Sequence, residues 1–196
     1  MKSRAQVIFV LSVALVFLLP ISAAGQERRD YIIAKGGVYS PTGGLDDLNF
    51  DTGFHGEIAW GHYFSPNLAL EAGAGFFESD DVQAVPLMVT GKVIYPTGNW
   101  ELFSEVGAGA YFAKFKGTVN HASLGYIEIN DDDVVFGLHL GFGVNYNLTE
   151  EFFLGIEGKY LVTTDAEFGG TAAGGSVKLE TDLDGFIVMG AFGFRF

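Results

Sequence analysis

Two pairs of residues have the chemical types needed for proton transfer or acyl transfer. Glu71 and His139 can each take up and release a proton, so they could form a proton or ion relay if the fold brings them together. His121 and Ser123 stand two positions apart, and an imidazole beside a hydroxyl can activate it as a nucleophile. Neither pair is sufficient alone, because both depend on the elements that position them.

Acidic and glycine clusters are the other candidates for ligand sites. Aspartates stand together at 46–47, 80–81 and 131–133, and their hard oxygens suit Ca²⁺ and Mg²⁺. These clusters lack the alternating ligand spacing of an EF-hand, and no glycine cluster opens a helix after a strand, as phosphate binding requires. We interpret the acidic clusters as solvated loops, with divalent-cation binding as the alternative, and expect no cofactor and no dedicated metal site.

The first 24 residues have the pattern of a Sec-type signal peptide. Lys2 and Arg4 form a positive start, residues 7–19 are apolar, and residues 22–24 are small. Cleavage after Ala24 predicts a mature domain over 25–196, with no linker that would divide off a second domain.

Composition excludes several classes of protein. The formal net charge of −13 over 196 residues is a poor match to nucleic acid, whose phosphates attract Lys and Arg. The sequence has no cysteine, so neither disulfides nor a lipid-anchored amino-terminal Cys can hold the exported chain. Beyond the signal peptide, no run of 18 apolar residues favours a membrane-spanning helix.

Alternation of polar and apolar residues dominates the mature chain and predicts β-strands. Each segment is about 10 residues or longer, the length that crosses a bilayer at a tilt. The predicted strands are 30–40, 52–63, 67–77, 83–95, 100–115, 134–146, 152–164 and 185–196.

Short and long links alternate strictly between these eight segments. The short links are 64–66, 96–99 and 147–151, and the long ones are 40–51, 78–82, 116–133 and 165–184. In an up-and-down meander, all short turns then fall at one end and all long loops at the other. This asymmetry is typical of a transmembrane barrel with periplasmic turns and extracellular loops. The sequence thus predicts an all-β, eight-stranded antiparallel up-and-down transmembrane β-barrel.

The two faces of each strand indicate which side is the inside. Even positions in 136–146 are all large and apolar, whereas the odd positions between them are mostly glycine or polar. Most strand glycines stand on the polar face. Glycine has no side chain, so it fits the narrow interior of an eight-stranded barrel, which side chains fill. We therefore expect the apolar face to contact lipid and the polar face to line a narrow lumen. Aromatic residues near the short turns are expected to form an interfacial girdle, namely Trp60, Phe64, Tyr95, Trp100, Tyr146 and Phe152.

The inward parity predicts an ion-pair network that fills the lumen, because charges sealed from water must be paired. Its expected members are Lys35, Glu57, Glu71, Lys92, Glu101, Glu105, His139, Glu157, Lys159 and Arg195. A relay through Glu71 and His139 remains the alternative use of the same groups.

The chain resembles the small eight-stranded outer-membrane barrels of Gram-negative bacteria, of the OmpW, OmpX and opacity type. The motifs that carry the resemblance are the terminal FGFRF, SPNLALEAGAGFF at 65–77 and GAGAYF at 107–112. The resemblance implies that the terminal aromatic strand, with Phe192, Phe194 and Phe196, is the signal read by the outer-membrane assembly machinery. His121 and Ser123 have the spacing found in lipid A deacylases of this barrel class, but no matching carboxylate strand follows them, so we expect no enzyme.

The sequence is compatible with two function classes. The first is a monomeric structural or surface-interaction protein whose long acidic loops contact lipopolysaccharide, outer-membrane lipid or other partners. The second is a narrow transporter for small apolar molecules, as the resemblance to OmpW implies. The polar lumen favours the first class.

Overall fold

The computed structural model describes residues 30–42, 51–79, 82–121, 125–172 and 175–196, all in strands and their connections. The ten strands are β1 (Asp30–Pro41), β2 (Gly53–Ser65), β3 (Leu68–Ser79), β4 (Val82–Thr97), β5 (Trp100–His121), β6 (Gly125–Asn147), β7 (Phe152–Thr163), β8 (Ala166–Ala172), β9 (Gly175–Thr181) and β10 (Gly185–Arg195). The predicted signal peptide lies outside the described residues. No helix in the described ranges is long and apolar enough to cross a membrane.

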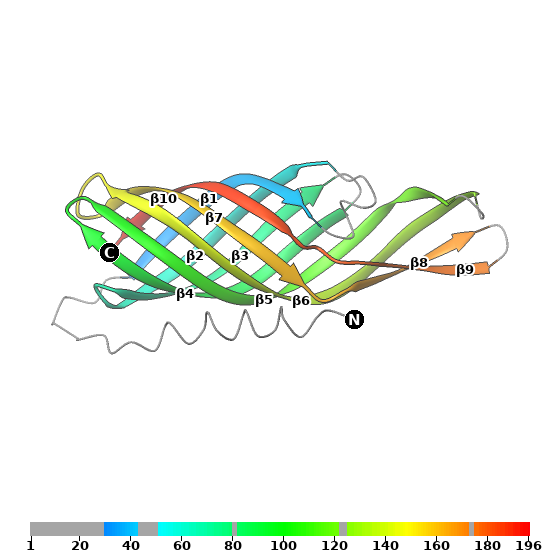
Figure 1. The fold of residues 1–196 in the computed structure, drawn as a ribbon, viewed down its shortest axis with the longest axis horizontal. Coiled ribbons are helices and arrows are strands. Elements are labelled where there is room, and N and C mark those ends of the chain that lie inside the picture. Colours follow the sequence, from blue (N-terminus) through cyan, green and yellow to red (C-terminus); the bar gives the residue numbers. More distant parts are fainter. Residues whose placement is uncertain (1–29, 43–50, 80–81, 122–124, 173–174) are drawn as a thin grey trace.

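Eight of the strands form a closed antiparallel barrel (Figure 1). Neighbours in sequence pair from β1 to β7, and β10 pairs with both β7 and β1. The seam that closes the ring aligns Tyr31 with Arg195 and Pro41 with Gly185. The predicted eight-stranded antiparallel barrel is confirmed, and closure leaves no open edge in its wall.

Two of the predicted long loops contain strand, which corrects the expected boundaries. β5 and β6 stay paired from Trp100 and Tyr146 out to His121 and Gly125, well past the predicted ends at 115 and 134. Residues 165–184 form the hairpin β8–β9, and β8 pairs with β6 through residues 170 and 171. In both segments the pairing supplies partners for the backbone amides and carbonyls. In Figure 1 these strands extend beyond the long-loop end of the barrel.

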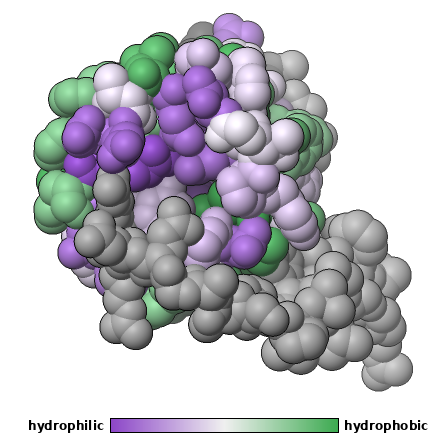
Figure 2. All heavy atoms as spheres, turned by 90° about the vertical axis from the view of Figure 1, so that its left-hand side faces the viewer, coloured by the Kyte–Doolittle hydropathy of each residue, from purple (hydrophilic) through white to green (hydrophobic). Residues whose placement is uncertain are grey.

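The outer wall is apolar, as the alternation predicts. Phe136, Phe142 and Ile156 are 64 to 75% exposed although they are large hydrophobic residues. The six aromatic residues expected near the short turns are also exposed, which suits an interfacial girdle. Figure 2 views the barrel from its short-turn end and shows hydrophilic residues gathered across that end, with apolar residues along the sides.

The interior is not uniformly polar, contrary to the sequence-based interpretation. A lower apolar layer near the short turns contains Tyr31, Ile33, Ala59, Ala69, Ile94, Phe103 and Phe153. An upper apolar layer near the long loops is larger and is built around Tyr39, Phe77, Met88, Tyr111, Phe115, Leu161 and Ile187. These residues share the inward parity of the charged groups, so charge and hydrophobic packing alternate along the barrel axis.

Candidate functional site

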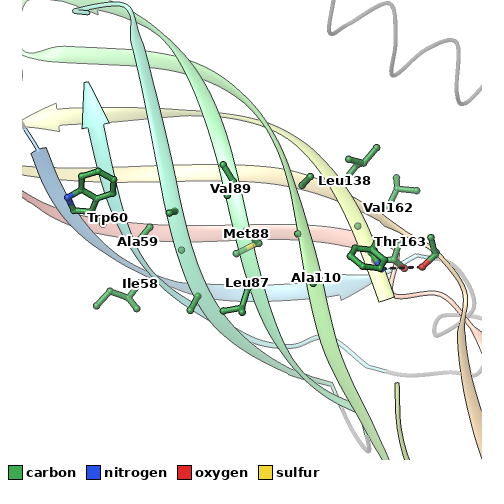
Figure 3. A pocket seen from close by; sticks show the side chains of 18 of the residues that line it. Ile58, Ala59, Trp60, Leu87, Met88, Val89, Ala110, Leu138, Val162 and Thr163 are labelled. Atoms are coloured by element: carbon green, nitrogen blue, oxygen red, sulfur yellow. Dashed lines mark hydrogen bonds between the residues drawn. The ribbon is translucent and has the colours of Figure 1, made fainter. Parts of the chain in front are cut away.

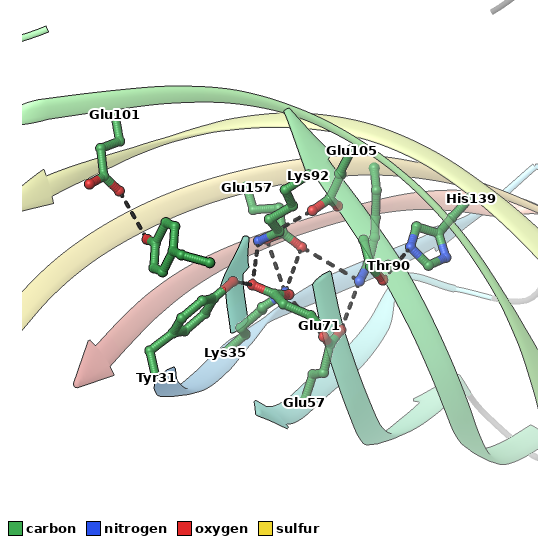
Figure 4. Close-up of polar contacts among 12 residues, drawn as sticks. Tyr31, Lys35, Glu57, Glu71, Thr90, Lys92, Glu101, Glu105, His139 and Glu157 are labelled. Atoms are coloured by element: carbon green, nitrogen blue, oxygen red, sulfur yellow. Dashed lines mark hydrogen bonds and ion pairs between the residues drawn. The ribbon is translucent and has the colours of Figure 1, made fainter. Parts of the chain in front are cut away.

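The central cluster is the ionic site between the two apolar layers, formed by Lys35, Glu57, Glu71, Lys92, Glu105, Glu157 and Lys159 (Figure 4). Six strands, β1 to β5 and β7, supply its members, and each member stands at an inward position of its strand. The fold brings them together because the ladder register aligns Lys35 with Glu57 and Lys92 with Glu105. All seven residues are at most 7% exposed.

Lys35 is the most highly connected base of the central cluster. Its Nζ lies 3.0 Å from Glu57 Oε1, 3.0 Å from Glu71 Oε2 and 3.1 Å from Glu157 Oε2. These contacts link β1 to strands on both sides of the closing seam. Buried ion pairs of this kind are strongly destabilised when one partner is removed, because the other charge is left uncompensated.

Lys92 and Lys159 complete the set of bases. Lys92 Nζ lies 2.8 Å from Glu71 Oε1 and 3.2 Å from Glu157 Oε2, and it stands 4.2 Å above the centre of the Phe103 ring. Lys159 Nζ lies 2.7 Å from Glu57 Oε2. The tight pairing of three lysines with these carboxylates holds six strands together across the lumen.

Two predicted relay residues lie in this region but do not contact each other in a relay. Glu71 is held by Lys35, Lys92 and the Tyr31 hydroxyl, which donates a 2.8 Å hydrogen bond to Oε1. His139 instead lies 3.0 Å from the Thr90 hydroxyl through Nε2. The structure therefore gives no geometric support to a relay through this pair.

Arg195 and Glu101 form a separate mouth cluster with Tyr63 and Asn147 at the short-turn end. Arg195 donates hydrogen bonds of 2.8 Å to Glu101 Oε2 and 2.8 Å to Asn147 Oδ1. Its guanidinium also stacks 4.4 Å from the centre of the Phe153 ring, within the lower apolar layer. The expected single network is thus two ionic groups separated by hydrophobic packing.

Sequence reasoning missed the inward aromatic rings that form this packing. A Cβ added to Gly61 would lie 2.0 Å from the Tyr31 ring, and one added to Gly193 would lie 2.0 Å from the Phe153 ring. The glycines thus leave room for rings that lie across the neighbouring strand. Tyr31 shares the parity of Lys35, so its inward position follows from the sequence, but the contrast between the two strand faces predicts an inner face that is polar throughout.

The predicted assembly residues lie on the outer face of the last strand. Phe192, Phe194 and Phe196 are 39 to 59% exposed, and Phe152 stacks beside the first two with ring centroids 5.8 and 5.0 Å away. Phe196 is tied down because its backbone N–H donates to the Asp30 carbonyl at 2.8 Å. The terminal aromatics are therefore ordered parts of the barrel wall.

Two of the acidic loop residues have a structural role. Asp131 accepts a 2.7 Å hydrogen bond from the backbone N–H of Gly169, and Asp133 accepts one of 2.9 Å from that of Glu167. These carboxylates join β6 to the start of the β8–β9 hairpin. In the described ranges, no group of three or more His, Asp or Glu side chains is arranged to hold a metal ion. Ser123 lies outside the described residues.

An apolar recess lies on the outer wall rather than in the lumen (Figure 3). Small Ala72 and Ala108 alternate with Trp60, Val89 and Leu138 along one row of register partners. The small residues leave the recess between the larger ones, on a surface that faces lipid in a membrane barrel.

The sequence matches one protein family over nearly its whole length. The match is to the outer membrane protein beta-barrel domain and spans residues 9–194. The chain belongs to this family. It is therefore a protein of the Gram-negative outer membrane.

Solved structures with the same fold differ widely in sequence. Neisserial surface protein A is 11% identical, with a TM-score of 0.60, covering 87% of this chain and 100% of that one. OprG from Pseudomonas aeruginosa is 14% identical (TM-score 0.59; 89% and 99% covered), and a major outer membrane protein from Thermus thermophilus is 16% identical (0.58; 87% and 100%). At such identities the likeness shows the fold alone. No significant match was found among curated proteins.

Proposed function

We propose that the protein is a non-enzymatic surface-interaction protein that presents an acidic β-sheet outside the cell. The observation that carries this proposal is the protruding sheet, which we define as 116–133 of β5 and β6 together with the β8–β9 hairpin. β5 and β6 have 22 and 23 residues, whereas the other barrel strands have 11 to 16. A barrel that only anchored itself would not need paired strands beyond the membrane.

The protruding sheet offers backbone edges that a partner can extend. Within the described residues, β9 pairs with β8 alone, and β5 beyond Phe115 pairs with β6 alone. An extended peptide can add to such an edge through main-chain hydrogen bonds. Strand edges are more specific than loose loops as binding sites, because their donors and acceptors are already in place.

Charge indicates the chemistry of the partner. Residues 116–133 and 165–184 contain nine acidic residues and only two lysines. A basic extended segment is attracted to this surface, whereas an acidic one is repelled. The partner class we propose is therefore a basic peptide segment that adds as a strand.

The proposal also includes the membrane partners. Lys114 is exposed on the outward face at the long-loop side, where it can meet lipopolysaccharide phosphates, and Asp132 is its register partner.

The barrel would act as a monomer that the outer-membrane assembly machinery inserts, with the terminal aromatic strand as signal. Its non-enzymatic character is supported by the pairing of Glu57, Glu71 and Glu157 with lysines, which act as structural ties.

Peptide binding to protein reconstituted in lipid vesicles tests the proposal. The probe is a peptide with Lys at every second position between Val and Thr, compared with its Glu analogue and with a proline-interrupted version of the same charge. Only the uninterrupted basic peptide should bind, and binding should weaken as salt is added. Replacement of residues 166–181 by a short Gly-Ser linker should reduce binding while the barrel still folds. Equal binding of the proline-interrupted peptide would contradict strand addition.

A second candidate function is lateral passage of small apolar molecules, and an interruption of the wall favours it. The β3–β4 ladder pairs Ala74 with Leu87 and resumes at Phe77 with Ala84. Pro86 lies in this gap and has no amide hydrogen to donate. The inward neighbours of the gap, including Phe77, belong to the upper apolar layer.

Uptake assays in cells can separate the two candidates. Pro86→Ala allows the ladder to close, whereas Pro96→Ala changes a proline at the exposed short-turn end of the same strand. If the gap is a passage, only Pro86→Ala should slow uptake of a small apolar probe. Equal uptake by both variants and by cells lacking the protein would remove the transport candidate.

A further inference from the structure

The central cluster holds more negative than positive charge. Glu57, Glu71, Glu105 and Glu157 face the ammonium groups of Lys35, Lys92 and Lys159. His55 Nε2 also lies 3.8 Å from Glu57 Oε2, and it adds a positive charge only when it is protonated. An uncompensated charge sealed between two apolar layers carries a large desolvation penalty. One further positive charge must therefore enter this part of the lumen.

Three of the four carboxylates are well paired, and the fourth is not. Glu57 contacts Lys35 at 3.0 Å and Lys159 at 2.7 Å. Glu71 contacts two lysines and the Tyr31 hydroxyl, and Glu157 contacts all three lysines within 3.5 Å. The three lysines thus match three carboxylates.

Glu105 is the carboxylate left over. It is 0% exposed, and neither of its oxygens has a hydrogen-bond partner among the described residues. Its one ion-pair contact is Lys92 Nζ, 3.4 Å from Oε2, and that ammonium lies closer to Glu71 and Glu157. Backbone also crowds it, since a Cβ added to Gly141 would lie 2.9 Å from Oε1.

We propose that Glu105 is a proton-binding site: the folded barrel holds this carboxyl as a neutral acid at neutral pH. The proton leaves three carboxylates facing three ammonium groups, so the central cluster is balanced. The titratable and charged groups packed around Glu105 are, strand by strand, Lys35 on β1, His55 and Glu57 on β2, Glu71 on β3, Lys92 on β4, His139 on β6, and Glu157 and Lys159 on β7.

A proton fits this site better than a metal cation does. A cation needs several oxygen ligands, whereas the free oxygens here belong to Glu105 alone, and no group of three or more potential ligands is found in the described ranges. A proton needs only one oxygen. The proposal therefore makes the lumen a site for a proton and not for Na⁺ or Ca²⁺.

Glu105 is a better position for the proton than either neighbouring histidine. A proton on His55 would face Glu57, a carboxylate that Lys35 and Lys159 already contact, and would leave Glu105 charged. His139 is 2% exposed, and Nε2 lies 3.0 Å from the Thr90 hydroxyl, while Nδ1 has no partner among the described residues. Protonation of His139 would create a buried cation in addition to the buried carboxylate. Protonation of Glu105 removes the uncompensated charge itself.

The bound proton couples barrel stability to pH. An exposed glutamate in the unfolded chain loses its proton above about pH 4.3, whereas the folded barrel keeps the proton on Glu105. Folding then takes up one proton, so this contribution to stability falls as pH rises. The well-paired carboxylates are ionised in both the folded and the unfolded state at neutral pH, so they do not contribute to the change of stability with pH there.

Infrared spectroscopy of the folded barrel in detergent is the direct test. The wild type at neutral pH should show the carbonyl band of a neutral carboxylic acid. Glu105→Gln should remove this band, whereas Glu78→Gln, which changes an exposed glutamate on β3, should keep it. Absence of the band from the wild type would overturn the proposal, even if the Glu105→Gln variant did not fold.

Equilibrium unfolding of paired variants provides an independent test. Glu105→Gln should fold at least as stably as the wild type. It should lose the fall in stability that the wild type shows as pH rises from the unfolded glutamate's pKa of about 4.3 toward neutral pH. Glu157→Gln should be strongly destabilised, because three buried ammonium groups would then share the two well-paired carboxylates of Glu57 and Glu71. Equal destabilisation by both variants would show that Glu105 is an ionised member of the cluster. Stability that depends on Na⁺ in the wild type but not in Glu105→Gln would assign the missing charge to a cation, and loss of the pH dependence in His139→Gln alone would assign the proton to His139.

Discussion

Removal of Lys35 is the perturbation that tests the central cluster most severely. Lys35→Met keeps most of the aliphatic length but leaves the four glutamates of the central cluster with two lysines. Three contacts of 3.0 to 3.1 Å disappear, to residues on β2, β3 and β7. Loss of one partner from a buried ionic group costs about 3–5 kcal/mol. The folded-to-unfolded ratio should therefore fall by roughly two to four orders of magnitude.

The measurement is denaturant unfolding in detergent, followed by the fluorescence of Trp60 and Trp100, which lie on the outer wall. Lys114→Met is the matched control, because Lys114 is exposed and its change should stay within about 0.5 kcal/mol. Adding Glu71→Gln to Lys35→Met should recover part of the loss, since the second change removes one of the negative charges that Lys35 compensated. A loss below about 1 kcal/mol for Lys35→Met would refute the description of the cluster as buried and mutually dependent.

Three further predictions concern the wall and its assembly. Gly193→Ala should destabilise the barrel by about 1–3 kcal/mol, because its Cβ would meet the Phe153 ring, whereas Gly190→Ala, with an added Cβ no closer than 3.9 Å to its neighbours, should have little effect in the same unfolding assay. Combined replacement of Phe194 and Phe196 by Ser should prevent outer-membrane insertion, measured by cell fractionation; normal insertion would remove the proposed signal. The folded wild type should migrate differently in gels before and after boiling, since boiling opens a closed barrel, and identical migration would argue against a stable closed ring.

Much of the fold could be predicted because alternation and link length act locally. The alternation of apolar and polar residues in 136–146 and 152–164 predicts both a strand and which of its faces points outward. The alternation of short and long links predicts that consecutive strands pair in an up-and-down meander. The strands within 116–133 and 165–184 were missed because their alternation is weaker and interrupted by glycine. Their pairing depends on contacts between distant segments, such as that of Asp131 with Gly169.

The candidate site was predictable in membership but not in arrangement. Parity places Arg195 and Lys35 on the same inward face, yet it does not give their height along the barrel axis. That height depends on register and strand tilt, which separate the mouth cluster from the central cluster. Glu105 lacks a close partner because Lys92 Nζ lies nearer to Glu71 and Glu157 than to Glu105. Only the side-chain geometry gives these distances.

The two apolar layers and the central cluster together close the lumen. Planar-bilayer recording of the refolded protein tests this claim. We expect no sustained conductance, because an eight-stranded barrel has an interior that side chains fill. A stable, ion-selective conductance that is lost in Glu71→Gln would contradict the closed lumen and would make the central cluster the lining of a channel.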